Sequence, residues 1–145
     1  MKALLQRVTR AEVLVGGNTI GAIGPGLLVF LGLDTGDNLE NGKRLLDKVL
    51  AYRVFADEEG RMNRSVIECA GGVLLVSQFT LSADTGRGLR PSFSSALAPA
   101  DAKPLFASLY DYLSAQHAST ACGQFGADMQ ISLVNDGPVT FLLEA

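Results

Sequence analysis

Apolar stretches alternate with glycine-rich turns over the first third of the chain, which is the pattern of consecutive β-strands. Residues 4–15 mix apolar and polar side chains and end at the hairpin-type turn 16–18. Residues 19–23 follow, and then come the Gly-Pro-Gly turn 24–26 and the continuous apolar run 27–31. An apolar run of that length between two turns is typical of a strand that is buried on both faces.

Two later segments show the spacing of amphipathic helices. Asp37 is placed to cap the first helix, with Glu40 in the reciprocal position of a capping box, and the apolar spacing ends near Tyr52. The second helix is expected over residues 101–117. Its apolar face is formed by Leu105, Leu109, Tyr112 and Leu113.

Short strands account for much of the remaining chain. We expect a strand at 53–56, a turn at 57–60 and a second buried run at 73–76. Residues 62–70 follow no clear pattern, and residues 82–91 read as a polar, glycine-rich loop.

The chain ends in two alternating segments, 129–134 and 139–143. The intervening residues 135–138, Asn-Asp-Gly-Pro, have the composition of a hairpin turn, which is the default interpretation. The whole pattern predicts one domain, residues 1–145, of the α/β (α+β) class. Its largely antiparallel sheet is expected to curl into a barrel, with two helices packed on it.

The composition is that of a compact folded protein, with 48% hydrophobic and 19% charged residues. Cys69 and Cys122 are too few and too far apart for a disulfide framework or a metal knuckle. The longest apolar run, residues 27–33, is far shorter than the ~20 residues of a membrane span, and no signal peptide is recognisable. We therefore expect a cytoplasmic protein with no membrane partner. The net charge of −3 argues against a protein that coats DNA or long RNA, but it is compatible with one that grips a short RNA end.

The side chains present exclude the common hydrolytic devices. A Ser-His-Asp or Cys-His arrangement needs a histidine base, and the one histidine, His117, lies at the polar end of the second predicted helix, where a structural role is expected. The sequence contains no Gly-x-Ser-x-Gly elbow, no phosphate-binding Gly-Lys-Ser/Thr loop and too few ligands for zinc. Any hydrolysis must therefore proceed without a histidine base, and we expect no metal and no cofactor.

Three segments carry polar groups where a functional site is plausible on chemical grounds. The buried run 73–76 leads into Ser77-Gln78-Phe79-Thr80, although hydroxyls at a strand end also bond to backbone. The turn Asn135-Asp136-Gly137-Pro138 is the second segment. The third is the loop 85–93, where Arg87 and Arg90 are suited to phosphates, although a solvated loop has the same composition.

Together these segments resemble a known family, the D-aminoacyl-tRNA deacylases, also called D-tyrosyl-tRNA deacylases. Residues 77–81, Ser-Gln-Phe-Thr-Leu, and 135–140, Asn-Asp-Gly-Pro-Val-Thr, resemble the two signature motifs of that family. Residues 6–8, 88–93 and 127–130 are also similar, so the resemblance covers the full chain. The sequence departs from the family at Glu12 and Arg64, which lie outside both motifs.

The resemblance implies a homodimer whose active sites lie at the interface. Ser77, Gln78, Phe79 and Thr80 of one subunit would line the pocket. Gly137 and Pro138 of the other subunit would insert into it, joined by a cis peptide bond. Arg7 would fix this insert, Met129 would pack beside the pocket, and Arg87 and Arg90 would hold tRNA phosphates.

The implied reaction is hydrolysis of the ester that joins a D-amino acid to the terminal adenosine of tRNA. Backbone N–H groups at Phe79 and Thr80 would stabilise the oxyanion, and the ribose 2′-hydroxyl and a water would transfer the proton. The rival scheme makes Thr80 the nucleophile, but an unassisted hydroxyl is a weak one. Carbonyls of Gly137-Pro138 would exclude L side chains, and glycyl-tRNA would escape this filter and be a second substrate.

Two other classes of function remain open at this point. The first is a non-enzymatic dimeric module that binds RNA ends or a translation factor, but the hydroxyls of Ser77 and Thr80 and the Gly137-Pro138 pair favour an enzyme. The second is an L-specific editing domain, which the resemblance connects by fold. The sequence shows no synthetase domain, which counts against it.

Overall fold

The computed structural model describes residues 1–145 as eleven elements. The strands are β1 (Lys2–Val15), β2 (Asn18–Ile23), β3 (Gly26–Gly32), β4 (Phe55–Ala56), β5 (Met62–Arg64), β6 (Gly72–Ser77), β7 (Thr120–Cys122) and β8 (Gln130–Glu144). The helices are α1 (Leu39–Ala51), α2 (Pro99–Gln116) and the single 3₁₀ turn η1 (Phe79–Ser82). Neither α-helix combines the length and the apolar character that a membrane crossing needs.

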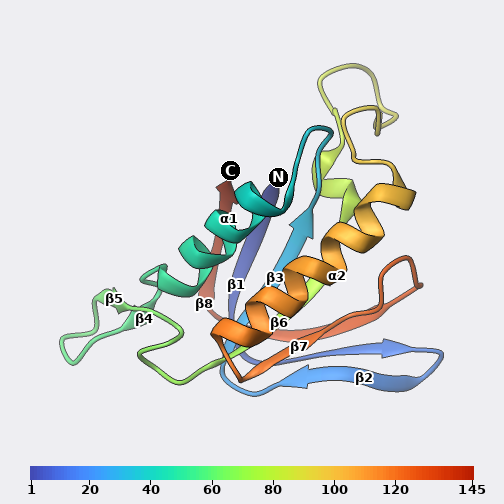
Figure 1. Cartoon of the computed structure of the whole chain (residues 1–145). Helices are drawn as coiled ribbons and strands as arrows, with labels where there is room; N and C mark the ends of the chain where they lie inside the picture. Colours follow the sequence, from blue (N-terminus) through green and yellow to red (C-terminus); the bar gives the residue numbers. More distant parts are fainter.

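The long strand β1 is the centre of the main sheet (Figure 1). β8 pairs with β1 along one edge, while β3 and β2 pair with successive halves of its other edge, all antiparallel. β3, β6 and β7 continue the sheet in parallel. β2 approaches β7 so closely that a Cβ on Gly21 would lie 2.7 Å from the Cys122 carbonyl oxygen, so the sheet nearly closes. This arrangement confirms the predicted fold class.

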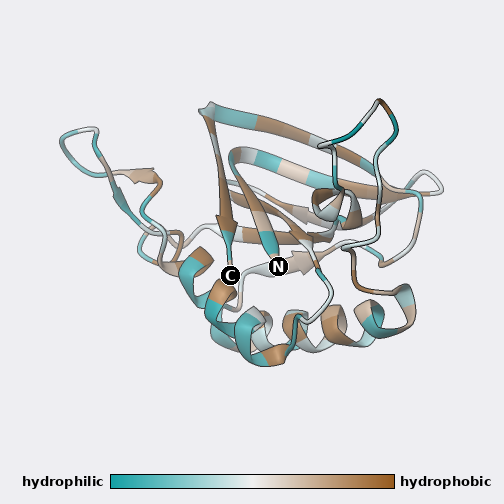
Figure 2. Ribbon diagram, turned by 90° about the horizontal axis from the view of Figure 1, so that it is seen from above, coloured by the Kyte–Doolittle hydropathy of each residue, from teal (hydrophilic) through white to brown (hydrophobic).

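The core has two parts, one on each face of the sheet. α1 and α2 cover one face, where they bury most of the apolar side chains, and the other face forms the barrel interior (Figures 1 and 2). Leu27, Val29 and Leu31 point toward the helices, whereas Leu28 points into the barrel. The predicted burial on both faces is therefore confirmed for Leu27, Leu28, Val29 and Leu31, whereas Phe30 is only half-buried.

The capping prediction for α1 is wrong by one residue. The N-cap is Asn38, whose side chain accepts the N–H of Asn41, and the side chain of Asn41 accepts the N–H of Asn38 in return. Asp37 does not cap the helix because its carboxylate binds the amino group of Met1 and the N–H of Asp34.

α2 also differs from the prediction in its start and in its apolar face. It begins at Pro99, a residue suited to the first helical position because it has no N–H to satisfy. Leu109 and Leu113 are buried as predicted, but Leu105 and Tyr112 are only half-buried. Phe106 and Ala102 take the remaining buried positions.

The hairpin predicted at residues 135–138 is absent. β8 is one strand, and its pairing with β1 shifts between Gln6↔Thr140 and Val8↔Asn135, so residues 136–139 bulge out opposite Arg7. The side chain of Asn135 spans this bulge, because its Oδ1 accepts the N–H of Val139 at 2.7 Å and its Nδ2 donates to Thr140 Oγ1 at 2.9 Å. The turn-like residues 135–138 therefore belong to a bulge within a strand and do not form a hairpin turn.

Candidate active site

A pocket of about 530 Å³ opens beside the carboxyl ends of the parallel strands β3 and β6. Its walls come from the end of β3, from the start of η1, from the connection into α2 and from residues 125–129. Eleven of its fifteen lining residues are hydrophobic. The pocket is therefore suited to an apolar or aromatic group held at the edge of the sheet.

The segment Ser77-Gln78-Phe79-Thr80 turns sharply at this pocket. The N–H of Gln78 still donates to the Leu31 carbonyl at 2.8 Å, and the chain then enters η1. The N–H groups of Phe79 and Thr80 occupy the first two positions of η1, which have no acceptor within the helical turn. Two neighbouring free donors beside a mostly apolar pocket are suited to stabilising an oxyanion.

The structure brings four of the predicted site residues to this pocket: Ser77, Gln78, Phe79 and Met129. Phe79 is 59% exposed, and its ring packs against that of Phe93 with a centroid distance of 4.9 Å. Thr80 is exposed and does not line the pocket.

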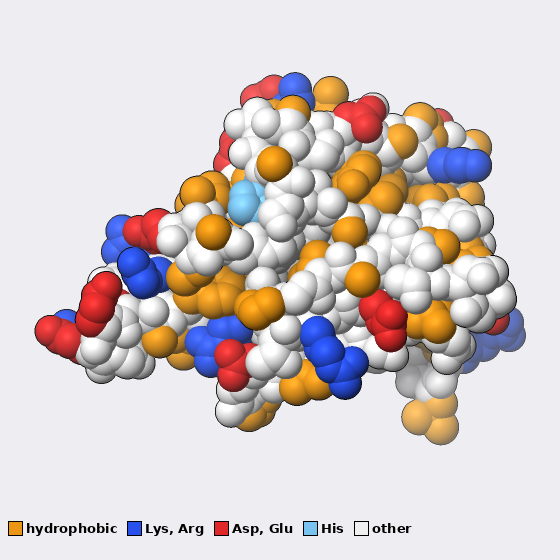
Figure 3. Space-filling model, turned by 90° about the horizontal axis from the view of Figure 1, so that it is seen from below, with side chains coloured by type: hydrophobic (Ala, Val, Ile, Leu, Met, Phe, Trp, Pro, Cys, Tyr) orange, Lys and Arg blue, Asp and Glu red, His pale blue; other side chains and the backbone are white.

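No ionisable side chain lines the pocket. The polar side chains in its wall are those of Ser77 and Gln78, neither of which is a base at neutral pH. His117 makes a structural contact, since its Nε2 lies 2.7 Å from the Gly71 carbonyl oxygen (Figure 3, pale blue). No group of three or more His, Cys, Asp or Glu side chains is arranged to hold a metal ion. The pocket thus provides hydrogen-bond donors without a protein base.

Gly137 and Pro138 lie away from this pocket, at the opposite end of β3. Arg7 holds the bulge, because its Nε donates to the Asp136 carbonyl at 2.9 Å and its Nη1 donates to the Val54 carbonyl at 2.6 Å. Arg7 pairs with Leu27, whereas the pocket begins at Leu31. Four residues of strand separate the two positions by about 13 Å.

The peptide bond between Gly137 and Pro138 is cis, and both residues are exposed. The bulge that contains Gly137 and Pro138 is therefore a separate surface feature, and within one chain it does not contact the pocket.

Arg87 and Arg90 lie on the long connection between η1 and α2, which rises above the body of the protein (Figure 1). The loop is closed at its base, where the backbones of Asp84 and Ser92 exchange hydrogen bonds of 2.8 and 3.0 Å. Both arginines are exposed, and neither forms an ion pair within the chain.

Several residues of the pocket wall have a place in the site that the sequence pattern did not indicate. Phe93, Phe125 and Ala127 line the pocket, although no role was predicted for them. Phe93 and Ala127 fall in segments that carry the family resemblance, which was the available signal. Phe125 had no such signal in the sequence. Its ring packs against Phe106 of α2 at a centroid distance of 5.9 Å, a contact that only the tertiary fold creates.

Comparisons with known proteins agree along the whole chain. The family model described as D-Tyr-tRNA(Tyr) deacylase matches residues 4–144. A D-aminoacyl-tRNA deacylase of Azotobacter vinelandii is 58% identical over 145 residues and is covered completely, as is this chain. One of Herminiimonas arsenicoxydans is 60% identical over 148 residues, with 99% of this chain and 97% of the relative covered.

Solved structures share the fold over nearly the full length. One described as "c-Myc DNA Unwinding Element Binding Protein" is 40% identical with a TM-score of 0.95, and the match covers 100% of this chain and 99% of the other. A "probable eukaryotic D-amino acid tRNA deacylase" is 16% identical with a TM-score of 0.83, covering 98% and 97%. The second similarity shows the fold alone.

Proposed function

Because the chain belongs to the D-Tyr-tRNA(Tyr) deacylase family and is therefore a hydrolase of D-aminoacyl-tRNA, we propose that its pocket binds the aminoacylated 3′ end and cleaves the ester without a protein base. One observation carries this proposal: the N–H groups of Phe79, in the pocket wall, and of the adjacent Thr80 have no acceptor within η1, and the pocket contains no ionisable side chain. The proton must then be moved by the substrate and by water.

The proposed reaction follows from this arrangement. A water oxygen attacks the ester carbonyl carbon, and the N–H groups of Phe79 and Thr80 stabilise the negative oxygen that develops. The ribose 2′-hydroxyl relays the water proton to the departing ribose oxygen, the ester C–O bond breaks, and free amino acid and tRNA are released. Thr80 is not the nucleophile in this scheme, because it lies outside the pocket lining and has no base beside it.

Phe79 offers a matched pair of variants that tests the oxyanion contact. Phe79→Pro removes the N–H without costing an intrahelical hydrogen bond, since proline is favoured at the first helical position. The preceding residue, Gln78, is non-helical (φ −145°, ψ 83°), as a residue before proline must be. Phe79→Ala removes the same ring but keeps the N–H. We expect kcat to be lower for Phe79→Pro than for Phe79→Ala by about 10²–10³-fold; equal rates would exclude the contact.

We place chiral selection at Gly137-Pro138 of a second subunit. In one chain these residues are exposed and lie about 13 Å of strand away from the pocket, so both features act together only if another copy supplies one of them. The carbonyl groups of the bulge, fixed by Arg7, would accept hydrogen bonds from the α-amino group and block the direction of an L side chain.

The sheet surface between this bulge and the pocket supports a homodimer. Leu142 of β8 is 51% exposed and pairs with the half-buried Leu4 of β1, which pairs in turn with the half-buried Phe30 of β3. These apolar side chains lie on the sheet face away from the helices, and Leu142 is on the same strand as Gly137-Pro138. A second copy of the chain would cover them. The bulge of each subunit would then lie close to the pocket of the other subunit.

Two further features of the substrate follow from the same scheme. A filter that acts by excluding side chains does not exclude glycine, so we propose glycyl-tRNA as a second substrate. We also propose that the exposed Arg87 and Arg90 contact phosphates near the tRNA end, which explains how an acidic protein binds RNA through a short contact.

The direct test uses D-tyrosyl-tRNA, L-tyrosyl-tRNA and glycyl-tRNA prepared on the same tRNA. We expect release of tyrosine from the D substrate and of glycine, with the L substrate cleaved at its spontaneous rate. Equal release from both tyrosyl substrates would contradict chiral selection. Binding of the D substrate without release would indicate an RNA-end binding module.

A further inference from the structure

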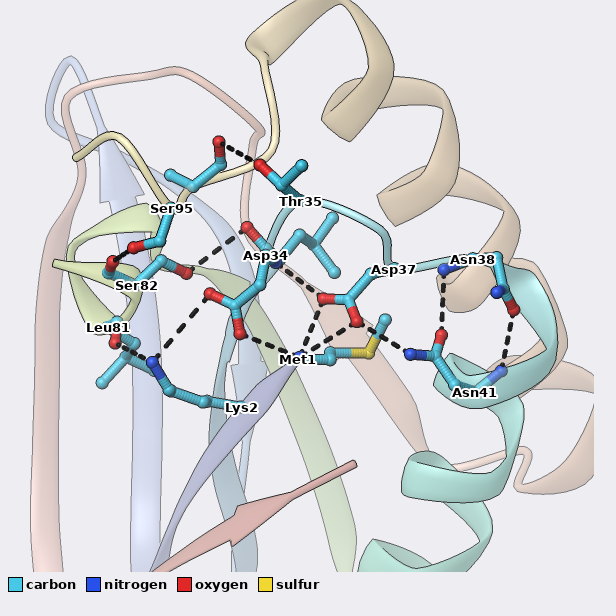
Figure 4. A network of polar contacts seen from close by, with 12 residues as sticks. Met1, Lys2, Asp34, Thr35, Asp37, Asn38, Asn41, Leu81, Ser82 and Ser95 are labelled. Atoms are coloured by element: carbon cyan, nitrogen blue, oxygen red, sulfur yellow. Dashed lines mark hydrogen bonds and ion pairs between the residues drawn. The ribbon is translucent and has the colours of Figure 1, made fainter. Parts of the chain in front are cut away.

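The amino group of Met1 is buried beside two aspartates in the connection between β3 and α1 (Figure 4). It donates to Asp34 Oδ2 at 2.9 Å and lies 2.8 Å from Asp37 Oδ2. The Met1 side chain is buried in the core, and its carbonyl accepts the N–H of Ala145 at 3.1 Å. Burial alone would lower the pKa of the amino group, but hydrogen bonds to Asp37 and Asp34 outweigh it and hold the pKa above its ordinary value.

Asp37 links this amino group to the cap of α1. Its carboxylate also accepts the N–H of Asp34 at 2.6 Å and the side-chain amide of Asn41 at 2.7 Å (Figure 4). Asn41 in turn accepts the N–H of Asn38 and completes the capping box. The positive charge of Met1 thus sits at one end of a hydrogen-bonded chain that leads into the helix.

Asp34 links the same amino group to the pocket wall. The residues on either side of Asp34 form backbone hydrogen bonds with residues 95–97 of the pocket wall. The Leu33 carbonyl accepts the N–H of Leu97 at 2.8 Å, and the N–H of Thr35 donates to the Ser95 carbonyl at 2.9 Å. Leu33 and Leu97 line the pocket. The orientation of Asp34 is therefore coupled to the position of residues 95–97.

We propose that a free ammonium group at Met1 positions the pocket wall, so that a chain beginning at Met1 binds the substrate better than the same chain carrying an acyl group or an added residue there. An acyl group removes the charge and leaves the carboxylates of Asp34 and Asp37, both only partly exposed, without their partner. An added residue moves the ammonium by one residue, about 3.8 Å. Because the Met1 side chain is fixed in the core, the chain cannot shift to bring the ammonium back to Asp34 and Asp37. Met1 is in this sense a positioning residue for the family reaction.

The test compares the chain that begins at Met1 with one that has a single glycine before Met1. Asp34→Asn removes the negative charge of the carboxylate that pairs with the Met1 ammonium. Asp111→Asn, on the exposed surface of α2, is the matched control. KM and kcat are measured with D-tyrosyl-tRNA, and backbone hydrogen exchange is followed at Thr35 and Leu97, with amides of β6 as reference.

We expect the added glycine to raise KM about tenfold with kcat changed by less than about twofold, because the wall binds but does not contain the oxyanion donors. Exchange at Leu97 and Thr35 should accelerate about tenfold, while β6 is unchanged. Asp34→Asn should have the same effects, and combining it with the added glycine should add less than the sum of the two, since both remove the contact between Met1 and Asp34. Asp111→Asn should resemble the unaltered chain.

Three results would overturn the inference: unchanged KM and exchange, faster exchange with unchanged KM, or a uniform loss that includes β6 and kcat. If the extended chain does not fold, Asp34→Asn alone decides between these results. The kinetic readout rests on the proposed function, but the exchange readout does not. Inactivity of the unaltered chain on D-tyrosyl-tRNA would therefore refute that function and leave the exchange comparison to decide the role of Met1.

Discussion

Thr80 is the residue at which the two schemes for proton transfer differ most. Its side chain is exposed and outside the pocket lining, so Thr80→Ala should lower the rate by less than about tenfold. A substrate whose terminal adenosine lacks the 2′-hydroxyl should instead lose about 10²–10³-fold in rate. Single-turnover release of the amino acid measures both. An inactive Thr80→Ala enzyme that still binds, with full activity on the 2′-deoxy substrate, would reverse the assignment.

Gly137 is the residue on which the proposed filter depends most. A Cβ there would lie 2.6 Å from Val139 Cγ2 and 2.8 Å from Val139 N, and its φ of +148° disfavours any side chain. Gly137→Ala should therefore displace the bulge and lower D-tyrosyl-tRNA hydrolysis about tenfold or more.

The matched control for Gly137→Ala is Gly60→Ala in the β4–β5 turn. Gly60 also has a positive φ, +79°, but its side-chain position is open. We expect both substitutions to lower the free energy of unfolding by about 1–3 kcal/mol, while only Gly137→Ala lowers activity. Equal activity in the two variants would show that the bulge is not part of the site.

At the scale of elements, Gly42 explains how α1 and α2 cross. In an isolated helix, replacing glycine by alanine is stabilising by about 1 kcal/mol. Here the new Cβ would lie 2.5 Å from Leu109 Cδ2 on α2, and such overpacking costs about 1–3 kcal/mol. We expect Gly42→Ala to lower the urea midpoint, and the double variant with Leu109→Ala to be less destabilised than the sum of the single changes. A higher midpoint for Gly42→Ala would contradict the packing argument.

Elements whose signal is local were predictable from the sequence, and those that depend on a distant partner were not. The run 27–31 was assigned correctly because turns bound it on both sides. Asp37 was assigned as the α1 cap because nothing near it reveals that Met1, 36 residues away, occupies its carboxylate. The bulge at 136–139 was taken for a hairpin for the same reason, since its partner is Arg7 of β1.

The candidate site was predictable only in part for a related reason. Its first half, Ser77 to Phe79, follows a buried strand directly, so the sequence places it at the end of that strand. The aromatic wall at Phe93 and Phe125 is assembled by tertiary contacts and has no local signature. The distance between the pocket and Gly137 likewise emerges only from the register of β1, β3 and β8.

At the scale of the whole molecule, one complete site of the proposed kind requires two copies of the chain. The proposed oxyanion donors lie at one end of β3 and the proposed chiral filter lies at the other, and the exposed apolar surface between them is suited to a second copy. A site built in this way predicts that two different inactive subunits can complement each other.

Mixing Phe79→Pro with Gly137→Ala after subunit exchange tests this claim most directly. Each mixed dimer would pair the intact pocket of one chain with the intact bulge of the other, and would leave its second site with both defects. Random pairing makes about half of the dimers mixed, so the mixture should recover about a quarter of the wild-type D-tyrosyl-tRNA activity. If the activity of the mixture stays at the average of the two separate variants although mixed dimers are present, the pocket and the bulge do not form one site across the interface.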